Sequence, residues 1–279
     1  MPKPRADATS PKTRHSAGNA WNRVILHTCE RMVEIPDHAV HLAVVAPPFT
    51  NDKDRRTLDK EHYIAFLQRV FVELDRVTHP LGTLVTINTD LRDHARYNRG
   101  QREYDGLLWH KHSDICRIAA VAGFACFHTK IWAKSLKTGV YRLTYSHVQL
   151  FRRPNLAQRL AARPPVPGFA PDVWLLPGGS HRRLRGGGFF RDAIHPLIAA
   201  RCIAQFTRPG DLVLAPFAGS GTIPAVAHIM DRTWMAYETD KSLLPLIRQS
   251  VYGPVRPPVF ATSALDIALL AHHSSHARS

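Results

Sequence analysis

Two glycines and a carboxylate along one stretch of the chain have the residue types of a nucleotide-cofactor site. Gly219 and Gly221 lie between an apolar run that ends at Leu214 and another that starts at Thr222. Glycine permits a tight turn with close backbone approach, and the helix start that follows offers free N–H groups to an anion. Glu238 follows about 20 residues later, the usual spacing for an acid that binds a ribose. The stretch is therefore predicted to form half of a cofactor site.

The same turn excludes one class of cofactor and leaves others open. No Lys follows Gly221, so the Gly-Lys-Ser/Thr signature of a triphosphate-binding loop is absent. A ribose-bearing cofactor without a triphosphate remains, either a dinucleotide or S-adenosylmethionine. The glycines alone are also compatible with a structural turn that binds nothing.

The loop Ala46-Pro47-Pro48-Phe49 is a second candidate site. It directly follows an apolar run over residues 40–45 that is predicted to be a buried strand. Two prolines stop both strand and helix, because proline lacks an N–H donor and restricts the residue before it. A strand that runs straight into Pro-Pro-aromatic is unusual for a simple turn, so the loop is a candidate for chemistry.

The elements that must position these two loops alternate along the chain. This alternation predicts an α/β fold with a mostly parallel, doubly wound sheet and helices on both faces. The hydrophobic spacing predicts strands over residues 40–45, 82–88, 125–133, 146–152, 212–214 and 233–237, and helices over 59–77, 113–122, 195–206, from 222 onward and over 241–252.

Charge points to a polyanionic partner. The 279 residues carry 37 Lys and Arg against 22 Asp and Glu, a formal net charge of +15. Nucleic acid is the partner that such a balance favours, and a basic surface that binds nothing is the alternative. Basic residues near aromatic residues or in Pro- and Gly-rich segments are the candidate nucleic-acid contacts. They are Arg92, Arg96, Arg99, Arg102, Lys134, Lys137, Arg182, Arg183 and Arg185.

Cysteine spacing and hydropathy argue against a cysteine-based metal site, a membrane span and a secretory signal. Four cysteines are scattered without Cys-x-x-Cys spacing or an adjacent His cluster, so no metal site is predicted. No segment has the apolar length of a membrane span, and the N-terminus lacks the apolar core of a secretory signal. We expect a cytoplasmic protein, associated with the nucleoid if it is prokaryotic.

The two candidate loops together resemble one enzyme family. Asp211 to Thr222 is similar to the Asp-Leu-Val-Leu-Asp-Pro-Phe-x-Gly-Ser-Gly-Thr cofactor motif of the N6-adenine and N4-cytosine DNA amino-methyltransferases, and Ala46–Phe49 resembles their Asp/Ser/Asn-Pro-Pro-Tyr/Phe loop. Because the Pro-Pro loop precedes the cofactor motif, the similarity is to the circularly permuted β-group. It implies a Rossmann-like methyltransferase domain over residues 19–252. Composition predicts a disordered basic arm at 1–18, nucleic-acid-contacting excursions at about 90–112 and 153–190, and a tail at 253–279.

The resemblance also implies roles for individual residues. S-adenosylmethionine is the implied cofactor and DNA the implied partner. Phe49 would stack on a base that has left the duplex, and the Pro47 carbonyl would hold its amino hydrogens. Pro48 and Ala46 complete the implied catalytic loop. The implied cofactor contacts are Thr28, Ala215, Phe217, Gly219, Ser220, Gly221, Thr222 and Glu238.

Three departures from the family pattern remove polar groups. Ala46 stands where the family has Asp, Asn or Ser, Ala215 replaces an Asp, and Thr28 stands where an Asp is expected. Two hypotheses follow. One is a DNA amino-methyltransferase with N4-cytosine slightly favoured, because Ala is closer to Ser in size and Phe at the fourth position also occurs with Ser. The other is an inactive pseudo-methyltransferase, natural or engineered, that binds nucleic acid or a partner. RNA as substrate, a homodimer and an active methyltransferase partner all remain open.

Overall fold

The computed structural model describes most of the chain between residues 21 and 253. The predicted basic arm and tail lie outside the described residues, as do Phe49, Arg96, Arg99, Lys137 and Arg185. The described ranges are 21–48, 60–92, 97–98, 101–102, 108–135, 143–154, 165–166, 168–177, 182–183, 189–190 and 193–253.

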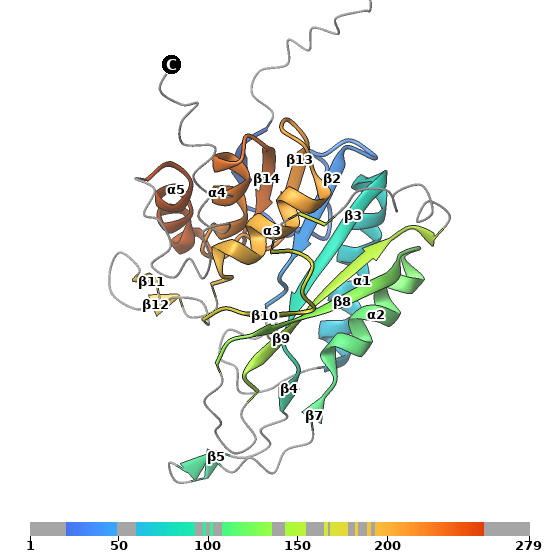
Figure 1. Cartoon of the computed structure of the whole chain (residues 1–279), viewed down its shortest axis with the longest axis vertical. Helices are drawn as coiled ribbons and strands as arrows, with labels where there is room; N and C mark the ends of the chain where they lie inside the picture. The colour runs from blue at the N-terminus through green and yellow to red at the C-terminus, as the bar shows by residue number, and fades with distance from the viewer. Residues whose placement is uncertain are drawn as a thin grey trace, which may run out of the picture.

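A single sheet dominates the described residues (Figure 1). It holds eight strands in the order β1-β14-β13-β2-β3-β9-β8-β10. All neighbouring strands pair in parallel except β9, which is antiparallel to both β3 and β8. Their bounds are β1 Arg23–Ile25, β2 Val40–Val45, β3 Thr78–Asn88, β8 Ala125–Ala133, β9 Tyr145–Arg152, β10 Val173–Leu175, β13 Leu212–Ala215 and β14 Thr233–Tyr237.

Helices cover the sheet on both faces (Figure 1). On one face lie α1, Lys60–Val77, and α2, Lys111–Val121. On the other lie α3, Pro196–Phe206, α4, Thr222–Ile229, and α5, Leu244–Tyr252, which a short 3₁₀ helix η2, Lys241–Leu243, precedes. Each set of helices buries its own hydrophobic cluster against the sheet. The predicted fold class, a mostly parallel Rossmann-like sheet between helical layers, is confirmed.

The central pair of strands explains where a ligand can bind. β13 and β2 are parallel neighbours, with Val213 opposite Leu42 and Leu214 opposite Ala43. The helix that follows β13 is α4 on one face, and the helix that follows β2 is α1 on the opposite face. The two connections leave on opposite faces, and at such a point the carboxyl ends of the strands are where open α/β sheets usually bind a ligand. We call this position the crevice.

The segment 153–190 was predicted to cross the surface, and for Phe169, Trp174 and Leu176 that prediction is wrong. β10 joins the edge of the main sheet beside β8, and Trp174 and Leu176 are 2% and 1% exposed. Phe169 packs on Trp174, with ring centroids 5.6 Å apart. The flanking Pro and Gly residues concealed a three-residue edge strand whose aromatic side chain fills the core. Only the small ladder between β11, Arg182–Arg183, and β12, Phe189–Phe190, follows within the described part of this segment.

The segment 90–112 is also partly core. β4, Leu91–Arg92, pairs with β7, Leu108–Trp109, and a second small ladder joins β5, Tyr97–Asn98, to β6, Gln101–Arg102. Asp90, Trp109 and Lys111 are buried, and α2 begins at Lys111 rather than at the predicted Ser113. Among the described helices, none combines the length and apolar character needed to cross a lipid bilayer.

Candidate functional site

The glycine turn after β13 has the backbone conformation that its sequence predicts. Gly219 and Gly221 have φ angles of 53° and 78°, in the left-handed region that favours glycine. A Cβ atom at Gly221 would also lie 2.9 Å from the Cα of Ile247 in α5. Glycine is therefore needed at 221 for two reasons, and the second is helix packing rather than ligand binding.

Glu238, at the end of β14, ties this turn to the next one. Its Oε2 accepts a hydrogen bond from the Gly219 N–H at 2.8 Å. Its Oε1 accepts from the N–H groups of Thr239 at 2.9 Å and Asp240 at 3.0 Å. A carboxylate has about four lone-pair sites, so acceptor capacity remains for a further donor such as a ribose hydroxyl. The side chain is part-buried and lies at the crevice edge of the sheet.

The other side chains of the cofactor stretch point into the protein or pack within it. Ala215, Ser220 and Thr222 are at most 4% exposed. The hydroxyls of Ser220 and Thr222 lie 2.9 Å apart, within hydrogen-bond distance of each other. Phe217 is partly exposed and packs beside Phe66, with ring centroids 6.0 Å apart. The turn can therefore offer a ligand its backbone and the ring of Phe217, rather than these hydroxyls.

The segment after β1 lies beside Glu238. β1 pairs in parallel with β14, and the Glu238 N–H donates to the Ile25 carbonyl at 3.0 Å. The Thr28 hydroxyl donates to Glu30 at 2.9 Å, so it is engaged within its own turn. Burial, with a contribution from the nearby Glu30 and Glu238 carboxylates, raises the pKa of the Cys29 thiol and keeps it protonated.

The Pro-Pro loop follows β2 and lies next to the glycine turn in the strand order. Ala46 is partly exposed, Pro47 is buried and Pro48 is exposed. The Pro48 carbonyl accepts two hydrogen bonds, from the Tyr63 hydroxyl at 2.7 Å and from Lys111 Nζ at 2.9 Å. Phe49, the predicted base-stacking residue, lies outside the described residues. The loop is thus anchored to α1 and α2 through one carbonyl.

Lys111 is a supporting residue that the sequence did not indicate. It is 1% exposed, and its Nζ lies 4.7 Å from the centroid of the Tyr63 ring. Burial lowers the pKa of Lys111 to about 7, and the charge of Asp90 acts in the opposite direction. Both protonation states of the amine carry an N–H, so the bond to the Pro48 carbonyl does not depend on its charge. A single Lys at a helix start gives no sequence signal for burial.

The predicted nucleic-acid contacts fall into three groups, of which the last lies outside the described residues. Lys134 is partly exposed, and its Nζ lies 4.9 Å from the centroid of the Trp132 ring and 3.3 Å from the Thr89 hydroxyl. The backbones of Arg92, Arg102, Arg182 and Arg183 lie in the small ladders described above. For all nine residues, Lys134 and those outside the described ranges included, nucleic-acid contact stays a prediction.

The donor and acceptor set at the crevice suits a ribose-bearing molecule. Glu238 supplies an acceptor, the glycine turn supplies backbone, and Phe217 supplies an apolar ring. Ala46 and Ala215 add no polar group at the ends of the two central strands. The arrangement can bind a sugar and position a second group above the Pro-Pro loop, and it contains fewer side-chain acceptors than the family pattern has.

Comparisons of sequence agree with this geometry. The family model described as DNA methylase matches residues 40–249. The type II methyltransferase M.BglII from Bacillus subtilis is 23% identical over 256 residues, which cover 81% of this chain and 67% of the relative. The type II methyltransferase M.MjaI from Methanocaldococcus jannaschii is 25% identical in an alignment of 289 positions, which covers 82% of this chain and 91% of the relative.

Comparisons of structure show the same fold. A protein from Thermus thermophilus, described as a DNA modification methylase complexed with S-adenosyl-L-methionine, matches with a TM-score of 0.65 at 23% identity, over 83% of this chain and 95% of that one. The cytosine-N4-specific PvuII DNA methyltransferase matches with a TM-score of 0.61 at 16% identity, over 89% of this chain and 92% of that one.

Proposed function

The chain belongs to the DNA methylase family whose model matches residues 40–249, and we propose that it transfers the methyl group of S-adenosylmethionine to an exocyclic amino group of a base in DNA. Membership of the family supports methyl transfer and DNA as the substrate. The finer assignments, namely the residues involved, the base and the level of activity, rest on the residue types of this chain and on the geometry of those that the structure describes.

One observation carries the proposal. The glycine turn with Glu238 and the Pro-Pro loop follow neighbouring parallel strands, β13 and β2, at the point where the connections leave on opposite faces. A cofactor held at the first loop would present its reactive group toward a base held at the second. This adjacency supports methyl transfer better than it supports a structural turn, because a structural turn does not require a second anchored loop beside it.

The protein would contribute to this reaction mainly by positioning the base and the methyl donor. S-adenosylmethionine, when bound, supplies a methyl group on a positively charged sulfur. The amino nitrogen of the base forms a bond to this methyl carbon as the sulfur–carbon bond breaks, and the nitrogen then releases a proton to water. The Pro47 carbonyl would accept an amino hydrogen and orient the nitrogen for attack. Tyr63 and Lys111 would hold the loop in place through the neighbouring Pro48 carbonyl.

N4-cytosine is the base that we favour over N6-adenine. Ala46 is closer in size to Ser than to Asp, and Phe49 at the fourth position of the loop also fits the Ser-containing version of the motif. The likeness in fold to a cytosine-N4-specific enzyme is compatible with this choice but does not decide it. Mass spectrometry of nucleosides from methylated DNA separates N4-methylcytosine from N6-methyladenine directly.

Two measurements test the proposed function. Calorimetric titration of the purified chain with S-adenosylmethionine should give one binding site per chain. Incubation with labelled S-adenosylmethionine and mixed-sequence DNA should then label the DNA. Absence of binding at millimolar cofactor would reject the enzyme. Binding to DNA should weaken steeply as salt is raised, because each Lys or Arg contact to phosphate releases a counterion.

A catalytically inactive DNA-binding protein is the second candidate, and a specific observation favours it. Ala46 and Ala215 leave both central loops without the polar side chain that the family pattern has at those positions, while the glycines and prolines are retained. Loss of one neutral hydrogen bond costs about 1 to 3 kcal/mol, or a factor of about 5 to 150 in rate. Loss of a charge-assisted bond from Asp would cost more.

Substitution of Ala46 by Ser separates the two candidates. An active enzyme with a weakened site should gain rate in A46S by up to about 150-fold, because a hydroxyl acceptor returns beside the base. A46V is the matched control, since it adds similar bulk without an acceptor. If neither the original chain nor A46S methylates DNA while both bind S-adenosylmethionine, the inactive candidate is supported.

A further inference from the structure

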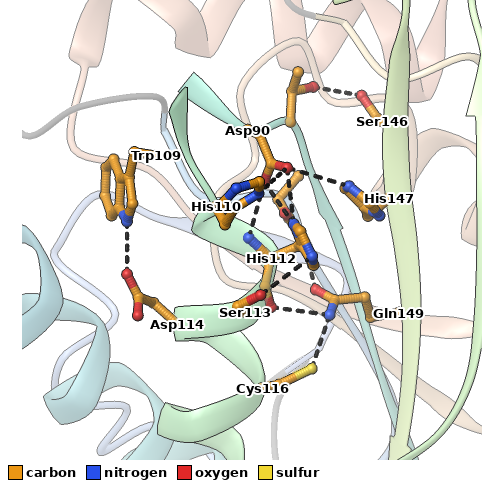
Figure 2. Close-up of polar contacts among 12 residues, drawn as sticks. Asp90, Trp109, His110, His112, Ser113, Asp114, Cys116, Ser146, His147 and Gln149 are labelled. Carbon is orange, nitrogen blue, oxygen red and sulfur yellow. Dashed lines mark hydrogen bonds and ion pairs between the residues drawn. The ribbon is translucent and has the colours of Figure 1, made fainter. Parts of the chain in front are cut away.

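A buried carboxylate surrounded by three imidazole rings lies outside the proposed cofactor and base sites (Figure 2). Asp90 follows the end of β3 and its side chain is 2% exposed. His112 Nδ1 lies 2.7 Å from Asp90 Oδ1, His110 Nδ1 lies 3.6 Å from Oδ2, and His147 Nε2 lies 3.5 Å from Oδ2. One ligand atom from each of Asp90, His110 and His112 can be chosen so that all three lie within 4.8 Å of one another.

Hydrogen bonding alone leaves part of this cluster unexplained. Of the three rings, His112 is the one within hydrogen-bond distance of Asp90. His147 Nε2 is buried and, within the described residues, makes no hydrogen bond, although it faces the carboxylate. The buried Asp90 carboxylate thus has the His112 backbone N–H and ring nitrogen within hydrogen-bond distance, while nitrogens of His110 and His147 face it from 3.5 to 3.6 Å, an arrangement that a cation could join.

The surroundings of His112 also have the form of a metal-ligand support. A histidine that binds metal through one nitrogen usually bonds a protein group through the other. His112 Nε2 lies 3.2 Å from the Ser113 hydroxyl, and Gln149 Nε2 donates to the His112 carbonyl at 3.0 Å. His147 stacks on the other side of the His112 ring, with centroids 4.0 Å apart. The ring is thus held from its backbone, its edge and its face (Figure 2).

We propose that Asp90, His110 and His112 form a binding site for a divalent transition-metal cation at the junction of β3 and α2. Imidazole nitrogens with one carboxylate are a ligand set that suits Zn²⁺ and its first-row neighbours rather than Mg²⁺ or Ca²⁺. The His110 side chain is 62% exposed, which gives the ion a path of entry and leaves room for water as a further ligand. The site departs from the sequence expectation of no metal site, which considered only the cysteines and the histidines adjacent to them.

The position of the site gives the metal a structural consequence. Lys111 lies between two of the ligands in sequence and donates to the Pro48 carbonyl of the Pro-Pro loop. A cation that joins Asp90 to the start of α2 would hold this junction in the conformation that carries Lys111. Because the ion binds only the folded chain, saturation with Zn²⁺ should raise the melting temperature.

Zinc titration of the full chain by calorimetry tests the proposal. H110A and H112A should each lose one equivalent of zinc, or bind it at least about tenfold more weakly, and should lose the zinc-dependent rise in melting temperature. H110A is the safer variant for folding, because its side chain is mostly exposed. H228A is the matched control: His228 is an exposed histidine that packs on Tyr252, away from the cluster, and its removal should leave zinc binding unchanged.

Cobalt provides a second readout of the ligand set. Co²⁺ bound by nitrogen and oxygen should give weak visible bands without the intense thiolate charge-transfer absorption that cysteine ligands would add. The proposal is overturned if zinc binding is equal in the original chain, H110A and H112A, or if the cobalt spectrum shows thiolate ligation. Because these measurements need neither S-adenosylmethionine nor DNA, they are independent of the proposed methyl transfer.

Discussion

The cofactor side and the base side of the crevice are stabilised in opposite ways. At the cofactor side, the carboxylate of Glu238 accepts hydrogen bonds from backbone N–H groups, among them that of Gly219. At the base side, the backbone carbonyl of Pro48 accepts from the side chains of Tyr63 and Lys111. At the cofactor side the charged group is the Glu238 carboxylate, which accepts hydrogen bonds. At the base side the charged group, when it is protonated, is the Lys111 amine, which donates one.

This difference separates local from long-range support. The partners at the cofactor side belong to one strand-helix-strand unit, β13-α4-β14, in which Gly219 and Glu238 are 19 positions apart. The partners at the base side come from three elements, and Lys111 is 63 positions from Pro48. A local unit has a fixed residue spacing, so it can be recognised in the sequence. An anchor between residues far apart in the chain has no such spacing and cannot be recognised in this way. We therefore expect substitutions at the two sides to affect different measurable quantities.

The largest loss of unfolding free energy is expected for a substitution at Gly221, where backbone strain combines with a steric clash against α5. Alanine there would carry a positive φ and place its Cβ 2.9 Å from the Ile247 backbone. We expect G221A to lower the free energy of unfolding by roughly 2 to 5 kcal/mol. G210A is the matched control, because Gly210 has a φ of 87° but no atom within 4 Å of the added Cβ. It should cost only about 1 to 2 kcal/mol in urea unfolding. Equal costs would show that packing against α5 is unimportant.

We expect a substitution at Glu238 to weaken binding of the cofactor at the glycine turn. In E238Q one amide N–H₂ replaces a carboxylate oxygen and meets a backbone N–H that needs an acceptor. Hydrogen bonds to charged groups contribute about 1.5 to 3 kcal/mol, so we expect the Kd for S-adenosylhomocysteine to rise by roughly 10- to 150-fold in calorimetry. D240N is the control, because the Asp240 carboxylate caps η2 by accepting from the N–H and hydroxyl of Ser242. A normal Kd in E238Q would remove Glu238 from the cofactor site.

Lys111 should affect turnover without affecting cofactor binding. K111M removes a donor to the Pro48 carbonyl but keeps an unbranched apolar side chain at a buried position. We expect kcat to fall by roughly 5- to 30-fold, because one hydrogen bond worth about 1 to 2 kcal/mol no longer fixes the loop. The Kd for S-adenosylhomocysteine should stay within about twofold, since the loss is at the other side of the crevice.

K60M is the control for charge near the same helix pair. Lys60 also lies over an aromatic ring, 5.3 Å from the Trp109 centroid, but its side chain is 50% exposed and it pairs with Asp114 rather than with the loop. Its removal should leave kcat unchanged. A parallel fall in K60M, or a matching loss of cofactor affinity in K111M, would contradict a specific role for Lys111.

The sequence predicted elements best where their signals were local. The bounds of β8, α3 and β14 agree with the predicted Ala125–Ala133, helix to Phe206 and Thr233–Tyr237. Proline and glycine lie near the ends of α3, and charged residues flank the apolar run of β14. The strand β10 was missed because its three residues lie among prolines and glycines, and only pairing with β8 makes them a strand.

The candidate site divides in the same manner. Gly219, Gly221 and Glu238 could be identified from type and spacing, and the structure brings them together. Lys111 and the cluster around Asp90 could not, because a lysine or histidine is ordinarily expected at the surface and its burial is decided by distant residues. Burial of Lys111 requires Tyr63 and Pro48 around it, and nothing in the residues next to it in sequence indicates them.

We expect the smallest loss of unfolding free energy at Glu73. This residue belongs to α1, the helix that connects the cofactor side of the crevice to the base side. Glu73 of α1 accepts from the Met32 N–H at 2.7 Å and from Arg76, which also donates to the carbonyls of Met32 and Ile35. These bonds hold the segment after β1, which carries Thr28, to the helix that carries Tyr63. Hydrogen bonding to Arg76 lowers the pKa of the Glu73 carboxyl from its usual 4.5.

The sign of the pH dependence follows from that lowered pKa. A carboxyl whose pKa is lower in the folded state stabilises the fold at pH values above its unfolded pKa, and this stabilisation disappears as pH falls through the folded value. E73Q should therefore cost about 1 kcal/mol of unfolding free energy at pH 7, and the cost should shrink as the pH falls below about 4.5. Urea unfolding of both proteins at several pH values measures the difference. Because the hydrogen bonds of Glu73 go to Met32 and Arg76 rather than to either loop, E73Q should leave the ratio of kcat to cofactor affinity unchanged, whereas a selective loss of either quantity would mean that the anchor acts on one side alone.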